Sequence, residues 1–110
     1  MAQAQWDYVF GTNPWGVSFI NSVGTVWPHD PHHQIAQLTG AELTGFWNEG
    51  AVERADWSTY GIDLSQPDEY SLFQSGWSLY HDDVADYVTN EPTVVANGVG
   101  FALTAYMTSN

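Results

Sequence analysis

The sequence predicts a mainly α fold in which helices at the two ends of the chain are joined by long ordered loops. Three observations predict it: good helix formers at residues 2–10, apolar positions at helical spacing after Asn90, and a middle rich in glycine and proline. A chain of 110 residues is long enough for one small core. We therefore treat residues 1–110 as a single small domain.

Residues 2–10 predict the first helix. They place Trp6 and Phe10 four residues apart, so that both side chains lie on one face. Gly11 is expected to end the helix, and the Asn13-Pro14 pair prevents it from resuming. Residues 13–34 then predict a long structured loop, and such loops are often functional.

The middle of the chain predicts little regular structure. Residues 35–50 indicate a helical turn followed by an extended segment. Residues 51–79 indicate a loop-rich insert with a short helix over residues 68–74. This insert carries five aromatic residues, which are Trp57, Tyr60, Tyr70, Phe73 and Trp77.

The C-terminal segment predicts the longest helix, starting at Asn90. Thr89 or Asn90 is expected to cap it, which would place Glu91 in its first turn, where Pro92 is tolerated. One apolar stripe follows at helical spacing, made of Val95, Val99, Ala102, Leu103 and Tyr106.

Two glycines interrupt this stripe. Gly98 and Gly100 each cost about 1 kcal/mol of helix propensity relative to alanine. We expect both to allow close packing against another backbone.

The charge balance restricts the partners. Thirteen acidic residues face the single Arg54 and no lysine, giving a formal net charge of −12. This charge argues against nucleic acid and anionic membranes and favours a neutral or cationic ligand. No cofactor is required by any motif; calcium is possible, although the spacing of an EF-hand is missing. No leader and no membrane segment are expected, because no stretch has the necessary apolar length.

The composition also points to sugars. Six tryptophans and six tyrosines exceed what a small core needs, and flat sugar faces stack on such rings. Filling of the core by large aromatics is the alternative.

Glu91 is the candidate catalytic residue. Asp82, Asp83 and Asp86 precede it, and crowding of carboxylates favours a protonated form that can act as a general acid. The N-terminus of the predicted helix opposes this effect, since it favours the ionised form by roughly 0.3–1 kcal/mol. An exposed Glu91 would be only a helix cap.

A histidine cluster lies in the first loop, in the run from Trp27 to His33. His29, His32 and His33 together could hold a metal ion. Alternatively, His32 donates hydrogen bonds to a polar ligand from a loop stiffened by prolines, or the histidines are structural.

Two patterns carry a family resemblance. The first is an aromatic residue, Asp, a second aromatic residue and Glu at fixed spacing, followed by a small residue and Asn; these are Tyr80, Asp82, Tyr87, Glu91, Thr93 and Asn97. The second is a Gly-x-Asn-Pro-x-Gly-x-Ser stretch that begins at Gly11 and leads to Pro31-His32-His33. With both patterns in this order, the chain resembles the C-terminal segment of a glycoside hydrolase family 9 catalytic module, a cellulase family.

The resemblance implies part of an (α/α)6 barrel that hydrolyses β-1,4-glucan outside the cell by inversion. It implies that Glu91 is the general acid, that Asp82 supports the acid loop as a second catalytic residue, and that His32 binds the sugar. We place four further residues in the substrate-binding set: Tyr80, Tyr87, Gln34 and Trp27. No metal ligand is assigned.

The chain departs from the family pattern in three ways. Gln34 stands where the family has arginine, and segment 46–79 is longer than the corresponding loop. The family's Asp-x-Gly-Asp motif for the catalytic base is absent, so the base would come from a local aspartate or another chain. A non-catalytic carbohydrate-binding module is therefore the alternative, and we expect either a missing N-terminal portion or a homo-oligomer.

Overall fold

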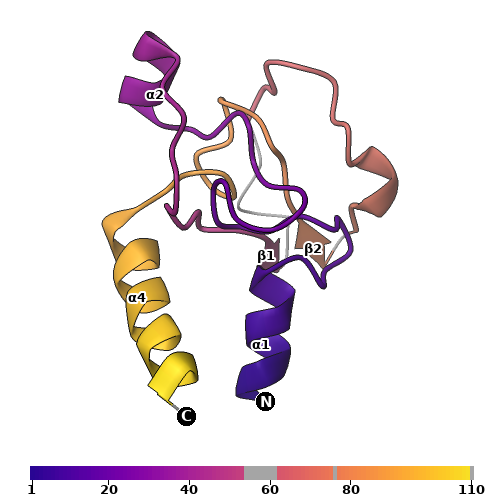
Figure 1. Ribbon diagram of the computed structural model, residues 1–110. Coiled ribbons are helices and arrows are strands. Elements are labelled where there is room, and N and C mark those ends of the chain that lie inside the picture. Colours follow the sequence, from indigo (N-terminus) through magenta and orange to yellow (C-terminus); the bar gives the residue numbers. More distant parts are fainter. Residues whose placement is uncertain (54–61, 76, 110) are drawn as a thin grey trace.

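The computed structural model describes residues 1–53, 62–75 and 77–109, which measure 42 × 34 × 24 Å (Figure 1). In these residues the regular elements are the helices α1 (Ala2–Val9), α2 (Gln34–Thr39) and α4 (Val94–Ser109), the 3-10 helix η1 (Ser71–Phe73), and the antiparallel strands β1 (Val52–Glu53) and β2 (Ser78–Leu79). Helix outweighs strand, as predicted, and loops connect the elements. Trp57 and Tyr60 lie outside the described residues.

Helix α1 confirms the N-terminal prediction. It ends where Phe10 N donates to Trp6 O over 3.1 Å and Gly11 N donates to Tyr8 O over 3.3 Å. Gly11 has a φ of 117°, a conformation that favours glycine. The loop that follows is held by Asn13, whose Nδ2 donates to the backbone oxygens of Tyr8 and Val17 over 2.8 and 2.7 Å.

The core is built by loops. The buried cluster consists of Trp15, Val17 and Phe19 from the first loop and Tyr80 from the segment after β2. Tyr80 has no exposed surface, and its ring centroid lies 5.0 Å from that of Phe19 and 6.0 Å from that of Trp15. This contact joins two segments that are distant in the sequence, so it fixes the first loop against the acidic stretch.

The predicted extended segment before residue 50 is confirmed. Its backbone forms isolated bridges with both neighbours, one between Ile20 and Trp47 and one between Asn48 and Pro92. Residues 46–50 therefore lie between residues 19–21 and residues 89–92. The loop, the extended segment and the residues around Glu91 form one hydrogen-bonded unit.

Helix α4 begins at Val94, so the prediction that it starts at Asn90 is wrong. Thr93 caps the helix, because its Oγ1 accepts from Ala96 N over 3.0 Å. A residue that precedes proline is disfavoured in helical conformation, and Pro92 is already engaged by the bridge to Asn48. Glu91 thus precedes the helix, and the opposing effect expected from the first turn does not apply.

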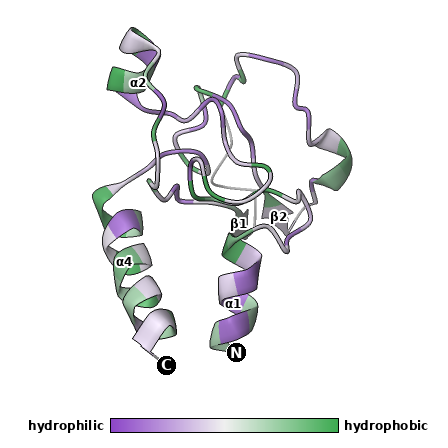
Figure 2. Cartoon of the chain, in the orientation of Figure 1, coloured by the Kyte–Doolittle hydropathy of each residue, from purple (hydrophilic) through white to green (hydrophobic). Residues whose placement is uncertain are grey.

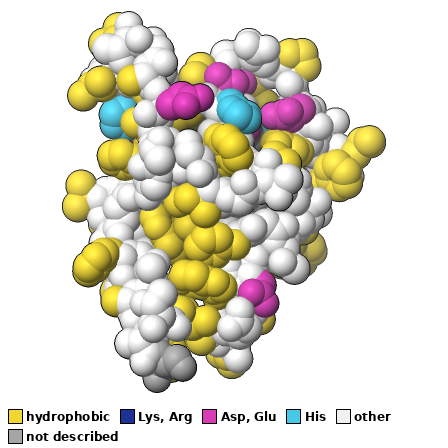
Figure 3. Space-filling model, viewed as in Figure 1, with side chains coloured by type: hydrophobic (Ala, Val, Ile, Leu, Met, Phe, Trp, Pro, Cys, Tyr) yellow, Lys and Arg dark blue, Asp and Glu magenta, His cyan; other side chains and the backbone are white. Residues whose placement is uncertain are grey.

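Most of the predicted apolar stripe on α4 is exposed in this chain. Val95, Val99 and Tyr106 are 71%, 64% and 58% exposed, and Phe101, outside the stripe, is 77% exposed. Figure 2 shows α4 mainly in hydrophobic and neutral colours, and Figure 3 shows apolar side chains gathered over the part of the molecule that carries α1 and α4. Neither the described part of α1 nor α4 buries an apolar side chain fully.

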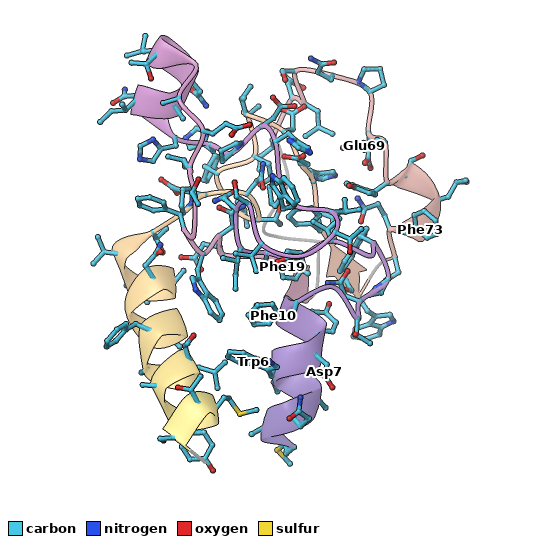
Figure 4. The ribbon with its side chains drawn as sticks, viewed as in Figure 1. Trp6, Asp7, Phe10, Phe19, Glu69 and Phe73 are labelled. Atoms are coloured by element: carbon cyan, nitrogen blue, oxygen red, sulfur yellow. The ribbon has the colours of Figure 1, made fainter. Side chains whose placement is uncertain are left out.

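Trp47 connects the two terminal helices. Its ring lies edge-on to Phe10, the residue that directly follows α1, with centroids 6.1 Å apart. On the other helix, Gly100 is buried, and a Cβ there would collide with the Trp47 ring. Figure 4 places Trp6 and Phe10 on the side of α1 that faces α4, with Asp7 on the opposite side. The prediction that both glycines pack against another backbone is wrong: Gly100 packs against the side chain of Trp47, and Gly98 has open space at its Cβ position.

This difference gives a paired prediction. Gly100→Ala should lower the free energy of unfolding by about 1–2 kcal/mol, because the clash with Trp47 outweighs the gain in helix propensity. Gly98→Ala should raise it by roughly 0.5–1 kcal/mol, since nothing opposes the gain. Urea denaturation of the two variants and the parent chain measures both values. Equal stabilisation by the two substitutions would contradict the contact.

Candidate functional site

Glu91 projects from a fixed backbone. Its carbonyl oxygen accepts from Glu49 N over 3.0 Å, and Gly50 N donates to Thr89 O over 2.9 Å. The residue is partly exposed, and within the described part of the chain its carboxylate takes no hydrogen bond.

Asn90 joins the neighbouring segments. Its Oδ1 accepts from Tyr80 Oη over 2.8 Å and from Asn48 Nδ2 over 3.2 Å. Its Nδ2 donates to Asp30 O over 2.7 Å and to Asp82 Oδ1 over 3.0 Å. The side chain is completely buried and uses all its hydrogen-bonding positions. The sequence suggested only a helix cap here, so this role was missed.

Asp82 holds the histidine loop. Its Oδ2 accepts from His29 N over 2.8 Å, and its Oδ1 accepts from Asp30 N over 2.9 Å in addition to Asn90. Both carboxylate oxygens are thus engaged by backbone or amide donors. The arrangement positions the loop beside residues 90–91.

His32 lies beside this unit. Its backbone N donates to Asn90 O over 2.8 Å, and its Nδ1 lies 2.5 Å from Val84 O. A carbonyl oxygen only accepts, so Nδ1 carries the proton, and in the neutral ring Nε2 is an acceptor. The ring of Tyr87, which is 56% exposed, stands edge-on to His32 with centroids 6.1 Å apart. Together they form a polar and aromatic surface.

Asp83 and Asp86 have structural roles. Burial acts to raise the pKa of the Asp83 carboxyl, but hydrogen bonds from Ala85, Ser65 and Gln66 outweigh it, so the pKa lies below its ordinary value. Burial also acts to raise the pKa of Asp86, and hydrogen bonds from His81, Thr89 and Val88 again lower it. Both side chains are buried, and their carboxylates accept hydrogen bonds from other residues of the chain.

Repulsion between carboxylates is concentrated elsewhere, at Asp30 and Glu69. Partial burial raises the pKa of each, and the charge of Asp82 raises both further. Burial, with added repulsion from Glu69 and Asp82, also raises the pKa of Tyr70 to about 12. Glu69, labelled in Figure 4, comes from the segment before η1. Sequence reasoning missed this grouping, because only tertiary contacts bring residue 69 near residues 30 and 82.

The remaining predicted substrate-binding residues have three different surroundings. Tyr80 is fully buried in the core and holds Asn90, so it presents no surface to a sugar. Gln34 is exposed as the first residue of α2. Trp27 is partly buried and lines a pocket against α2. Of the predicted set, the structure gathers Asp82, His32, Tyr87 and the buried Tyr80 around the segment that carries Glu91.

The histidine loop does not form a metal centre in the described residues. No three side chains among the described His, Asp and Glu residues lie where they could share a metal ion. Calcium binding remains a prediction. Within the same residues, no helix has the length and apolar character needed to span a membrane.

The residues that hold Glu91 match a known family. The family model for glycosyl hydrolase family 9 matches residues 1–103. The chain belongs to this family. The two sequence patterns therefore correspond to one physical unit, the hydrogen-bonded segments around Asn90 and Glu91.

Several plant proteins of this family are similar to the chain. It is 27% identical to Endoglucanase 18 of Arabidopsis thaliana over 99% of its own length and 23% of the relative's. It is 29% identical to Endoglucanase 2 of Oryza sativa subsp. japonica over 81% of its length and 14% of the relative's. The chain thus spans less than a quarter of the relatives it matches. No solved structure gives a significant match.

The lowered pKa of Asp86 predicts acid sensitivity. A carboxylate whose pKa is depressed on folding contributes stability that is present above its ordinary value of 3.8 and is lost as pH falls through the folded pKa. Urea denaturation between about pH 6 and pH 3 should show this loss.

In the same measurement, Asp86→Asn should be less stable near neutral pH and should lose less stability on acidification. The control is Asp7→Asn, which removes an exposed carboxylate on α1 that accepts one hydrogen bond from Gln3. Parallel pH profiles for Asp86→Asn and the parent chain would contradict the role of Asp86.

Proposed function

We propose that this chain supplies the proton-donating side of a site that hydrolyses β-1,4-glucan with inversion, with Glu91 as the general acid. The supporting observation is the partly exposed carboxylate of Glu91, which accepts no hydrogen bond from the described residues and stands on a backbone fixed from both sides. Family membership and the endoglucanase names of the relatives support the reaction class.

In the proposed reaction, Glu91 protonates the glycosidic oxygen as the bond to the anomeric carbon breaks. His32 and Tyr87 contact the sugar: His32 hydrogen-bonds a hydroxyl group through Nε2, and the exposed Tyr87 ring offers a face on which the sugar stacks. Asp82 acts as a positioning residue, because its oxygens hold the backbone of residues 29–30. Gln34 offers hydrogen bonds without the charge of an arginine.

The three aspartates closest in sequence to Glu91 are poorly placed to act as the catalytic base. Asp83 and Asp86 are buried in local hydrogen bonds, and Asp82 is engaged at both oxygens. An inverting pair needs two carboxyl groups roughly 6.5–9.5 Å apart with water between them. We therefore propose that the base comes from another part of the protein or a partner chain.

The exposed apolar faces agree with this proposal. In a partial (α/α)6 barrel, α1 and α4 would pack against further helices, which would cover the residues that are exposed here. The acidic surface and a polymeric substrate favour action outside the cell.

Removal of the acid gives the direct test. Glu91→Gln in the protein that carries the complete site should reduce hydrolysis of soluble cellulose by about 10²–10⁴-fold, because a neutral amide cannot deliver the proton. The loss should shrink sharply with an aryl cellobioside whose leaving group needs no protonation. Rates of reducing-sugar and phenolate release measure the two cases.

Glu49→Gln is the matched control for this test. Glu49 lies on the adjacent strand-like segment, and its carboxylate accepts a hydrogen bond from Thr93 Oγ1. It should retain most activity. Unchanged hydrolysis by Glu91→Gln, or an equal loss on both substrates, would exclude the proposed acid.

A non-catalytic carbohydrate-binding module is the second candidate. The observation in its favour is that none of the three aspartates closest in sequence to Glu91 is placed to act as a base. Calorimetric titration with cello-oligosaccharides should then show binding without turnover. Tyr87→Ala should weaken binding by about fivefold through loss of ring contact. The absence of saturable binding would reject this candidate.

A further inference from the structure

Tyr80 lies in the core, and its hydroxyl group reaches Asn90, the residue before the proposed acid. Its side chain has no exposed surface, and its ring centroid lies 6.0 Å from that of Trp15 and 5.0 Å from that of Phe19. Its backbone is held by Gln74, whose Oε1 accepts from Tyr80 N over 3.1 Å and whose Nε2 donates to Tyr80 O. Because both the ring and the backbone are fixed, the hydroxyl group has a defined position.

The Tyr80 hydroxyl is a hydrogen-bond donor. Its Oη lies 2.8 Å from Asn90 Oδ1, and an amide oxygen only accepts. Burial raises the pKa of the Tyr80 hydroxyl well above its ordinary value, and the charge of Asp82 raises it further, so the group keeps its proton. Among the described residues the other donor to Asn90 Oδ1 is Asn48 Nδ2, at 3.2 Å. The tyrosine therefore makes the shorter of these two hydrogen bonds.

The other polar groups of Asn90 face the segments of the site. Its Nδ2 donates to Asp30 O over 2.7 Å and to Asp82 Oδ1 over 3.0 Å. Its backbone oxygen accepts from His32 N over 2.8 Å, and Glu91 follows directly in the chain. A rotation of the Asn90 side chain would therefore disturb both the histidine loop and the backbone that carries Glu91.

We propose that Tyr80 is a positioning residue for the general acid: its buried hydroxyl group fixes the amide of Asn90, and this amide holds Glu91 where it protonates the glycosidic oxygen. The proposal rests on the proposed function of Glu91. The sequence predicted that Tyr80 binds the substrate, whereas here it acts through Asn90 without touching the sugar. A displacement of about 1 Å can lower a catalysed rate by about 100-fold, so one buried hydroxyl group is enough to change the rate.

Amide hydrogen exchange tests the physical step in this chain itself. Tyr80→Phe removes the hydroxyl group and keeps the ring in the core. It should speed exchange of His32 N–H, which is bonded to Asn90 O, by at least about fivefold relative to Ser18 N–H, which is bonded to Val26 O. An equal increase at both amides would reflect a loss of overall stability, and no increase would show that the hydroxyl group does not hold Asn90. Either result would overturn the proposal.

Kinetics test the effect on the acid. In the protein that carries the complete site, Tyr80→Phe should lower kcat for soluble cellulose by about fivefold to tenfold and leave KM within about twofold, since other residues contact the sugar. With the aryl cellobioside whose leaving group needs no protonation, the loss in kcat should be under about twofold. A loss of equal size on both substrates would indicate a general structural effect and reject the positioning role.

Tyr8→Phe is the matched control. The Tyr8 ring also packs against the core, with its centroid 6.1 Å from that of Phe19, and its hydroxyl group makes no hydrogen bond within the described residues. The substitution should leave kcat unchanged on both substrates. If Tyr8→Phe lowered kcat for cellulose as much as Tyr80→Phe, loss of any hydroxyl group beside the core would have this effect and the proposal would fail.

A double substitution separates this proposal from the hydrolytic one. If Tyr80 acts through Glu91, adding Tyr80→Phe to Glu91→Gln should lower the residual kcat for cellulose by less than about twofold. A further loss of about fivefold would show that Tyr80 acts elsewhere and would overturn the positioning role alone. Unchanged hydrolysis by Glu91→Gln without the second substitution would instead overturn the acid role and, with it, this proposal.

Discussion

The buried side chain of Asn90 is the constraint on which the site depends. One amide group receives hydrogen bonds from the core tyrosine and from the extended segment, and donates hydrogen bonds to the histidine loop and to Asp82. Three segments, around residues 30, 48 and 80–82, therefore meet at the residue directly before Glu91. Because every hydrogen-bonding position is used in a buried place, replacing the amide would leave several polar groups without partners. Few apolar side chains are buried in the described part of the chain, so this polar junction contributes much of what holds its centre together.

The carboxylates of residues 82–91 have two different roles. Asp82, Asp83 and Asp86 accept hydrogen bonds from backbone or side-chain donors and so shape loops that have little regular structure. With one arginine and no lysine in the sequence, such donors take the place that ion pairs have in other proteins. Glu91 differs from the three aspartates because no described donor reaches its carboxylate. The crowding expected around Glu91 is found instead at Asp30 and Glu69.

Local patterns were sufficient for much of the fold. The extent of α1, the long first loop and the existence of the C-terminal helix follow from helix formers, glycines and prolines near each position. The start of α4 could not be predicted in this way, because Thr89 and Asn90 are good caps whose side chains are already hydrogen-bonded to Asp86 and Asp30. Gly98 and Gly100 look alike in sequence, and only the position of Trp47 distinguishes them. Likewise, Tyr80 and Tyr87 occupy similar places in one pattern, yet one is buried and the other exposed. The candidate site was therefore predictable in its residue types but not in their division between core and surface.

The contact between Asn97 and Trp47 makes the number of residues between Glu91 and Asn97 important. Asn97 Oδ1 accepts from Trp47 N over 3.0 Å, and its Nδ2 donates to Trp47 O over 3.1 Å. One side chain is therefore hydrogen-bonded to both backbone polar groups of Trp47. The ring of Trp47 also packs against Gly100. Each residue inserted into a helix turns the following ones by about 100°. A single insertion between Thr93 and Asn97 would turn the Asn97 side chain away from residues 46–50, which lie beside Glu91. The number of residues between Thr93 and Asn97 therefore determines how α4 is rotated relative to the carboxylate of Glu91.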